Sequence, residues 1–193
     1  MKNTPADFIT VVSGLPRSGT SMMMQMLAAG GMPVVSDGLR TADADNPRGY
    51  FELEAVKKSK TDPTWVAGAR GHAVKVISML LCELPADYEY RVIFMLRDMG
   101  EILASQKEML KRRGTLGADS GDAAMQRHFE AHLKKVRAWM AERKNFRVLY
   151  CEHGELLREP ASHAHRVGDF LGGSVDEPAM VRAIDPALHR NRA

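Results

Sequence analysis

Residues 8–21 read Phe-Ile-Thr-Val-Val-Ser-Gly-Leu-Pro-Arg-Ser-Gly-Thr-Ser. The first six form a nearly continuous apolar and β-branched run, which is typical of a strand buried on both faces in a parallel sheet. Gly14 and Gly19 then delimit a loop, and residues 20–29 predict a helix that Gly30-Gly31 ends. The chain therefore opens with a strand, a glycine loop and a helix.

Strands and helices alternate along the rest of the chain. Further strands are predicted at Pro33–Val35, His72–Ser78, Arg91–Leu96 and Arg147–Tyr150. Helices are predicted over Asp98–Arg113, over Ala123–Arg143, from the end of the last strand to about Leu171, and over Glu177–Ile184. Asp98 has capping-box spacing to Glu101. This alternation predicts a three-layer α/β fold with a mostly parallel central sheet of about four to five strands flanked by helices.

Length and composition limit the possible classes of protein. The 193 residues suit a single domain, residues 1–193, and the net charge of +3 is too small to predict a nucleic-acid or polybasic membrane surface. The longest apolar run, Val76–Leu81, is far shorter than the ~20 residues of a membrane helix, and residues 1–7 predict no secretory signal. Cys82 and Cys151 lie in apolar runs, which favours reduced, buried thiols. We expect a soluble, cytoplasmic protein.

The loop from Gly14 to Ser21 has the glycine spacing of a phosphate-binding loop, with one departure. Thr20 stands where a nucleoside triphosphatase has lysine, and Arg17 offers a cation in its place. Backbone N–H groups of residues 18–21 would converge on an anion at the helix N-terminus. The strand at residues 91–96 is followed by Arg97 rather than by a carboxylate suited to Mg²⁺. These features predict an anhydride substrate that is handled without a metal.

At this point the sequence resembles the sulfotransferases that use 3′-phosphoadenosine-5′-phosphosulfate. In that family a loop like Pro16–Ser21 binds the 5′-phosphosulfate, and an arginine ending a strand, with a serine eight residues later, binds the 3′-phosphate. Arg97 and Ser105 match this second pattern, and residues 46–52 and 148–152 also resemble bacterial-type members. The resemblance implies one phosphate-loop domain with 3′-phosphoadenosine-5′-phosphosulfate as donor, adenosine 3′,5′-bisphosphate as product and no metal requirement. The donor-binding residues that it implies are Arg17, Ser18, Gly19, Thr20, Ser21, Arg97 and Ser105.

The catalytic base is harder to assign. Aryl and steroid members of the family use a histidine in a Lys-Thr-His motif, and here Lys75 matches the lysine but no histidine follows it. Members that act on carbohydrates use a glutamate after the first helix, for which Glu52 is the counterpart, and His72 is an outside candidate. The resemblance therefore implies Arg17, Lys75 and Glu52 as catalytic residues. Each also has a structural alternative: Glu52 as a helix-capping acid, Lys75 as a lysine that is paired or turned toward water, and Arg17 as a surface arginine on an ordinary loop. For Arg97, the alternative is a salt bridge at the end of a strand.

The acceptor is predicted to be a hydroxyl or amine on a small molecule or a carbohydrate. Residues 36–71 and 114–121 are the candidates for selecting and enclosing it, and a second subunit, giving a homodimer, is an alternative way to complete the pocket. Arg190 and Arg192 are candidates for a further phosphate contact, and His128 with His132 has metal-ligand spacing but favours a solvated helix face. Two rival functions remain open: a small-molecule kinase or nucleoside triphosphatase with Asp98 on Mg²⁺, and a nucleotide-binding module without turnover.

Overall fold

A five-stranded, entirely parallel sheet forms the centre of the computed structural model, which describes residues 7–43, 46, 48–115 and 122–185. The spatial order is β2-β3-β1-β4-β5, and every pairing between neighbours is parallel. The strands are β1 (Phe8–Gly14), β2 (Val34–Val35), β3 (Ala73–Lys75), β4 (Glu89–Leu96) and β5 (Phe146–Glu152). The predicted α/β class with a parallel sheet flanked by helices is confirmed.

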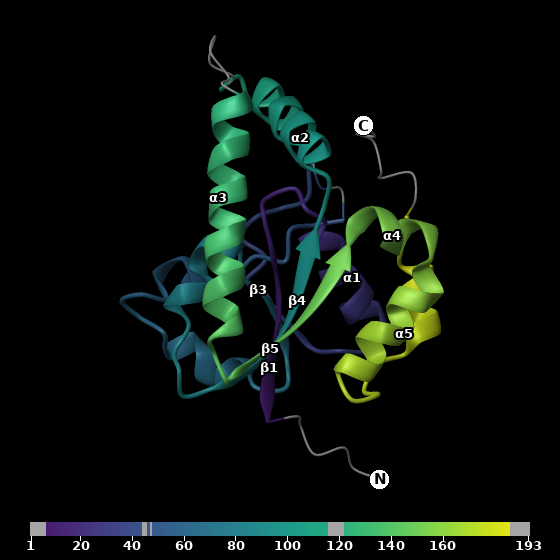
Figure 1. Cartoon of the computed structure of the whole chain (residues 1–193). Coiled ribbons are helices and arrows are strands. Elements are labelled where there is room, and N and C mark those ends of the chain that lie inside the picture. The colour runs from purple at the N-terminus through teal and green to yellow at the C-terminus, as the bar shows by residue number, and fades with distance from the viewer. Residues whose placement is uncertain (1–6, 44–45, 47, 116–121, 186–193) are drawn as a thin grey trace.

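Helices cover both faces of this sheet (Figure 1). The helices are α1 (Thr20–Ala29), α2 (Met99–Arg112), α3 (Asp122–Ala141), α4 (His153–Arg158), α5 (Pro160–Phe170) and α6 (Glu177–Arg182), with 3₁₀ helices η1 (Glu54–Lys58), η2 (Thr64–Ala69) and η3 (Ser78–Glu83). Side chains alternate between the faces along each strand. Val11 therefore packs in the core cluster that includes Val136 of α3, whereas Val12 packs with the methionines of α1.

Local patterns explain where several elements begin and end. The Asp98 side chain accepts a hydrogen bond from the backbone N–H of Glu101 and caps α2, as the capping-box spacing predicts. Gly30 ends α1, again as predicted. The third strand is shorter than the predicted residues 72–78, because the chain turns into η3 at Ser78.

The two cysteines differ in burial, which corrects the expectation that both are enclosed. Cys151 lies in β5 and is fully buried, and burial raises its thiol pKa to about 11. Cys82 is exposed, because it lies on η3, and a short helix on the surface turns one side to solvent. Both thiols are free.

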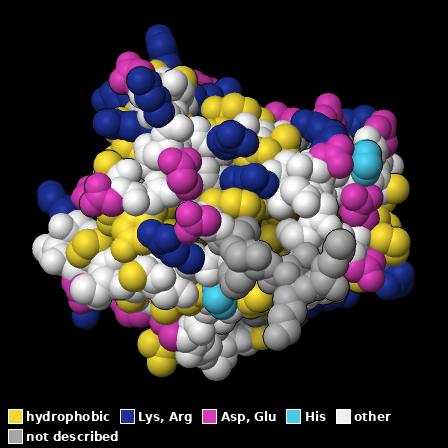
Figure 2. All heavy atoms as spheres, turned by 90° about the horizontal axis from the view of Figure 1, so that it is seen from below, with side chains coloured by type: hydrophobic (Ala, Val, Ile, Leu, Met, Phe, Trp, Pro, Cys, Tyr) yellow, Lys and Arg dark blue, Asp and Glu magenta, His cyan; other side chains and the backbone are white. Residues whose placement is uncertain are grey.

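The surface at the end of the molecule where β1 begins carries acidic and basic side chains interspersed with one another (Figure 2). This mixture agrees with the small net charge of the sequence. Among the helices that the structure describes, none combines the length and the apolar composition needed to cross a membrane.

Candidate functional site

The carboxyl ends of the parallel strands meet at one edge of the sheet, where ligands of open α/β sheets bind. The glycine loop, residues 14–19, follows β1 at this edge, Lys75 ends β3, Arg97 follows β4 and His153 follows β5. In Figure 1 the arrowheads of β4 and β5 point toward α2 and α4, into which the chain continues. A pocket of about 450 Å³ opens here, a size that suits a nucleotide or a metabolite. Its lining includes Arg17, Thr20, Ser21, Glu52, Lys75, Arg97, Ser105 and His153.

The backbone of the glycine loop has an unusual conformation. Arg17 has φ of 71°, in the left-handed region that residues with a Cβ rarely adopt, and Gly19 has φ of 100°. A Cβ at Gly19 would lie 2.6 Å from Cδ2 of His153, so glycine allows the loop to approach the His153 side chain at the start of α4 this closely. Ser18 is buried in the loop before α1, and its Oγ has no hydrogen-bond partner among the described residues.

The first group of predicted donor-binding residues is assembled around Arg17. Its Nε donates a hydrogen bond of 2.9 Å to Oγ of Ser105, a residue 88 positions later in the chain. Arg97 donates from Nη1 to the backbone carbonyl of Arg17 at 3.0 Å, and from Nε to the Glu101 carboxylate at 2.7 Å. The Arg97 and Glu101 side chains are only 9% and 13% exposed. Arg97 therefore forms the salt bridge that was its structural alternative, and the same side chain also hydrogen-bonds to the backbone of the glycine loop.

A second group is assembled around Lys75, whose side chain is 8% exposed. Because Lys75 is in register with Val12 of β1, its side chain lies close to the start of α1. Nζ donates to Oγ of Ser21 at 3.1 Å and to the backbone carbonyl of Tyr50 at 2.9 Å. It also lies 3.7 Å from Oε1 of Glu52. The structure thus brings together Lys75 and Glu52, two of the three predicted catalytic residues, although they are 23 positions apart in sequence.

Glu52 is held by a cluster of side chains from the segment before η1. Nη1 of Arg40 donates to its Oε1 at 2.8 Å, and the Arg40 guanidinium stacks 3.3 Å from the ring centroid of Tyr50. The Tyr50 hydroxyl in turn contacts the Asp43 carboxylate. Glu52 precedes η1 rather than lying in its first turn, where Glu54 is the acidic residue. The alternative of a helix-capping role for Glu52 is therefore wrong.

Burial determines the electrostatics of Lys75. Loss of hydration lowers its pKa from 10.5 to about 8, with a smaller lowering by Arg40 and Arg17, while Glu52 opposes the shift. The folded protein therefore releases this proton at lower pH than the unfolded chain does. Stability that depends on Lys75 must rise as the pH increases from about 8 to about 10.5.

We expect the difference in free energy of unfolding between the wild type and Lys75→Met to change in favour of the wild type between pH 8 and pH 10.5. The change is expected to reach up to about 3 kcal/mol. Urea denaturation at a series of pH values measures it. Lys58→Met removes an exposed lysine and is expected to give no such divergence from the wild type. Parallel stability curves for the wild type and Lys75→Met would contradict the shift.

The sequence analysis gave no individual role to the polar pocket residues Arg40, Asn46 and His153, although Arg40 and Asn46 lie in the segment 36–71 that it proposed for the acceptor. Nδ2 of Asn46 donates to Oγ of Ser21 at 2.8 Å, so Ser21 is contacted by both Asn46 and Lys75. His153 directly follows a strand at the carboxyl edge, as Arg97 does, and this position in the sequence could have identified it as a pocket residue. Arg40 lies in an irregular segment, and no local pattern indicates its contact with Glu52.

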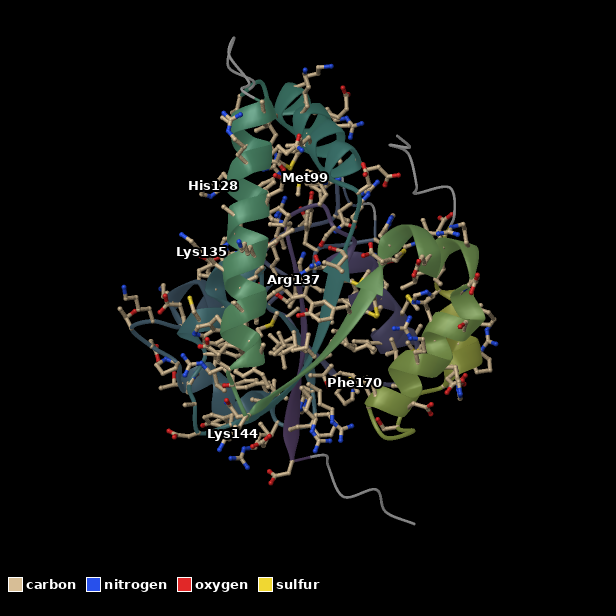
Figure 3. The ribbon with its side chains drawn as sticks, in the orientation of Figure 1. Met99, His128, Lys135, Arg137, Lys144 and Phe170 are labelled. Atoms are coloured by element: carbon tan, nitrogen blue, oxygen red, sulfur yellow. The ribbon has the colours of Figure 1, made fainter. Side chains whose placement is uncertain are left out.

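Other predicted residues lie elsewhere. His72 is at the amino end of β3, where its Nδ1 lies 2.7 Å from the Arg70 carbonyl, so it is on the opposite edge of the sheet from the pocket. His128 is exposed and points away from the sheet on α3 (Figure 3), whereas His132 is partly buried and contacts the Ser78 hydroxyl at 2.9 Å. Arg190, Arg192 and residues 116–121 of the proposed connection lie outside the described residues.

Known proteins are similar to this chain in structure, but no match was found at the level of sequence. No protein-family model matches the chain, and no curated protein sequence matches it. The structure is similar to the sulfotransferase domain from the curacin biosynthetic pathway, with a TM-score of 0.60 and 15% identity over 94% of this chain and 79% of that one. It is also similar to the sulfotransferase domain from the Synechococcus PCC 7002 olefin synthase, with a TM-score of 0.57 and 16% identity over 97% and 88%. The chain therefore has a sulfotransferase-like fold.

Proposed function

We propose that this protein transfers a sulfuryl group from 3′-phosphoadenosine-5′-phosphosulfate to a hydroxyl or amine acceptor. The observation that carries the proposal is the hydrogen bond from Arg17 of the glycine loop to Ser105, together with the hydrogen bond from Arg97 to the Arg17 carbonyl. These are the three side chains that the resemblance assigns to the two phosphate groups of the donor. The similarity of the fold to sulfotransferase domains supports the same activity.

In this proposal the donor occupies the side of the pocket between the glycine loop and α2. Backbone N–H groups at the start of α1, with Arg17, Thr20 and Ser21, hold the 5′-phosphosulfate, because the helix N-terminus and a planar guanidinium both favour an oxyanion. Arg97 and Ser105 hold the 3′-phosphate. Oγ of Ser105 then exchanges its contact with Arg17 for a phosphate oxygen.

Lys75 and Glu52 act at the sulfuryl group in this proposal. Lys75 Nζ lies beside Ser21, so it is placed to stabilise the oxygen that bridges phosphorus and sulfur as the bond to sulfur breaks. Among the described residues, Arg40 and Lys75 both contact Glu52 through Oε1, and in this proposal Oε2 accepts the proton of the acceptor.

The kinase alternative requires Asp98 to hold Mg²⁺, and the structure gives that residue another role. Its carboxylate caps α2, and Asp98 is not among the residues that line the pocket. Titration calorimetry separates the two functions. We expect adenosine 3′,5′-bisphosphate to bind with equal affinity with and without Mg²⁺, and ATP to bind more weakly.

Arg97→Ala is expected to weaken binding of the bisphosphate about 10- to 100-fold, because it removes a charge-assisted contact to a phosphate. Arg147→Ala makes the same change of charge on the exposed start of β5, away from the pocket, and is expected to leave the affinity unchanged. Binding of ATP alone, dependent on Mg²⁺, would overturn the proposal.

A further inference from the structure

The order of the strands divides the pocket into two sides. Strand β1, with the glycine loop at its end, lies between β3 and β4. Arg97 and Ser105, assigned to the donor's 3′-phosphate, lie on the β4 side, whereas Lys75 and Glu52 lie on the β3 side. Because a transferred group must lie between its donor and its acceptor, the acceptor occupies the β3 side.

Apolar side chains line part of the β3 side of the pocket, beside the charged side chains of Arg40, Glu52 and Lys75. Leu53 directly follows Glu52, and Leu80 projects from η3. The chain stays extended after Lys75, and the Val76 N–H still donates a hydrogen bond to β1. Because Ile77 lies two residues after Lys75, the side chains of Lys75 and Ile77 point to the same side. All three apolar residues are partly exposed and line the pocket.

This apolar wall is anchored in the core of the protein. Leu53 and Leu80 pack against the same buried cluster as Val56, Val74 and Val76, so they cannot swing away without leaving a cavity. A rigid, partly exposed carbon surface next to Lys75 and Glu52 gains free energy when an apolar group covers it, at roughly 25 cal/mol per Å². A sugar ring would cover it with hydroxyl groups that lose their water.

We infer that the acceptor is an alcohol or amine carried on an alkyl or aryl body, and not a carbohydrate. The inference rests on the proposed function and narrows the acceptor class. For an alcohol, the acceptor oxygen forms a bond to sulfur while the bond between sulfur and the bridging oxygen breaks. The electron pair of that bond leaves with adenosine 3′,5′-bisphosphate, and the acceptor proton passes to the Glu52 carboxylate.

The test compares two soluble acceptors, 2-phenylethanol and methyl glucoside, with 3′-phosphoadenosine-5′-phosphosulfate as donor. We expect kcat/KM for 2-phenylethanol to exceed that for methyl glucoside at least about tenfold, because an apolar wall discriminates by contact area. Leu80→Ser is expected to lower kcat/KM for 2-phenylethanol about tenfold without changing the affinity for adenosine 3′,5′-bisphosphate. Leu103→Ser, on α2 and outside the pocket lining, is the matched control and is expected to retain the wild-type value.

A second readout does not depend on turnover. Binding of 2-phenylethanol to the bisphosphate-saturated protein is expected to show a negative heat-capacity change, which Leu80→Ser reduces. Preference for methyl glucoside, transfer to neither acceptor, or equal behaviour of the Leu80 and Leu103 variants would overturn the inference while the donor site stands. Failure of the wild type to bind the bisphosphate would instead overturn the proposed function, and this inference with it.

Discussion

Glu52→Gln is expected to reduce kcat at least about 100-fold while the affinity for adenosine 3′,5′-bisphosphate stays within about twofold of the wild type. An amide has the shape of the carboxylate but cannot accept the acceptor proton, and a positioned general base contributes roughly 10²- to 10⁴-fold to rate. The donor contacts assigned to Arg17, Arg97 and Ser105 remain. Initial rates of bisphosphate release and calorimetric titration give the two quantities.

The matched control is Glu54→Gln, two residues later in the chain. Glu54 is exposed, pairs with Lys57 at 2.7 Å and is absent from the residues that line the pocket. We expect this variant to keep wild-type turnover. If Glu52→Gln also keeps it, another group is the base. A wild-type protein that binds the bisphosphate but transfers nothing to any acceptor would favour the nucleotide-binding module.

Gly14→Ala is expected to lower the free energy of unfolding by about 3 kcal/mol or more. Gly14 has φ of 148°, and a Cβ there would lie 2.6 Å from the backbone carbonyl oxygen of Met95 and would overlap Oγ of Ser18. The backbone of β4 cannot move aside, since it pairs with β1 and β5 along its length. Strain at a positive φ and overpacking each cost roughly 1–3 kcal/mol.

Gly31→Ala separates these two contributions. Gly31 also has a positive φ, 85°, but a Cβ there meets nothing within 4 Å. We expect a loss of about 1 kcal/mol, from the backbone strain alone. Urea denaturation of both variants gives the comparison. Equal losses would show that β1 and β4 separate at low cost, contrary to the close packing of the sheet.

Local patterns in the sequence were sufficient for the approximate positions of the strands and α-helices and for part of the site, but not for the 3₁₀ helices. The apolar run of β1, the glycine loop and the start of α1 are adjacent in the chain, so their order predicts an anion site without knowledge of the rest. The cap formed by Asp98 is also local, since it joins residues three positions apart. A buried strand cannot be distinguished from its neighbours by composition, however, so the order β2-β3-β1-β4-β5 was not predicted.

The tertiary structure alone decided which side chains meet at the carboxyl edge. The register of β3 against β1 places Lys75 beside Ser21, and tertiary packing brings Arg40 to Glu52 and Asn46 to Ser21 at this edge. The contact of Arg17 with Ser105 joins residues 88 positions apart. Such contacts depend on strand pairing and on packing between layers, which involve residues distant in sequence. A periodic pattern reports only whether a side chain is turned toward the core, and not which neighbour it finds there.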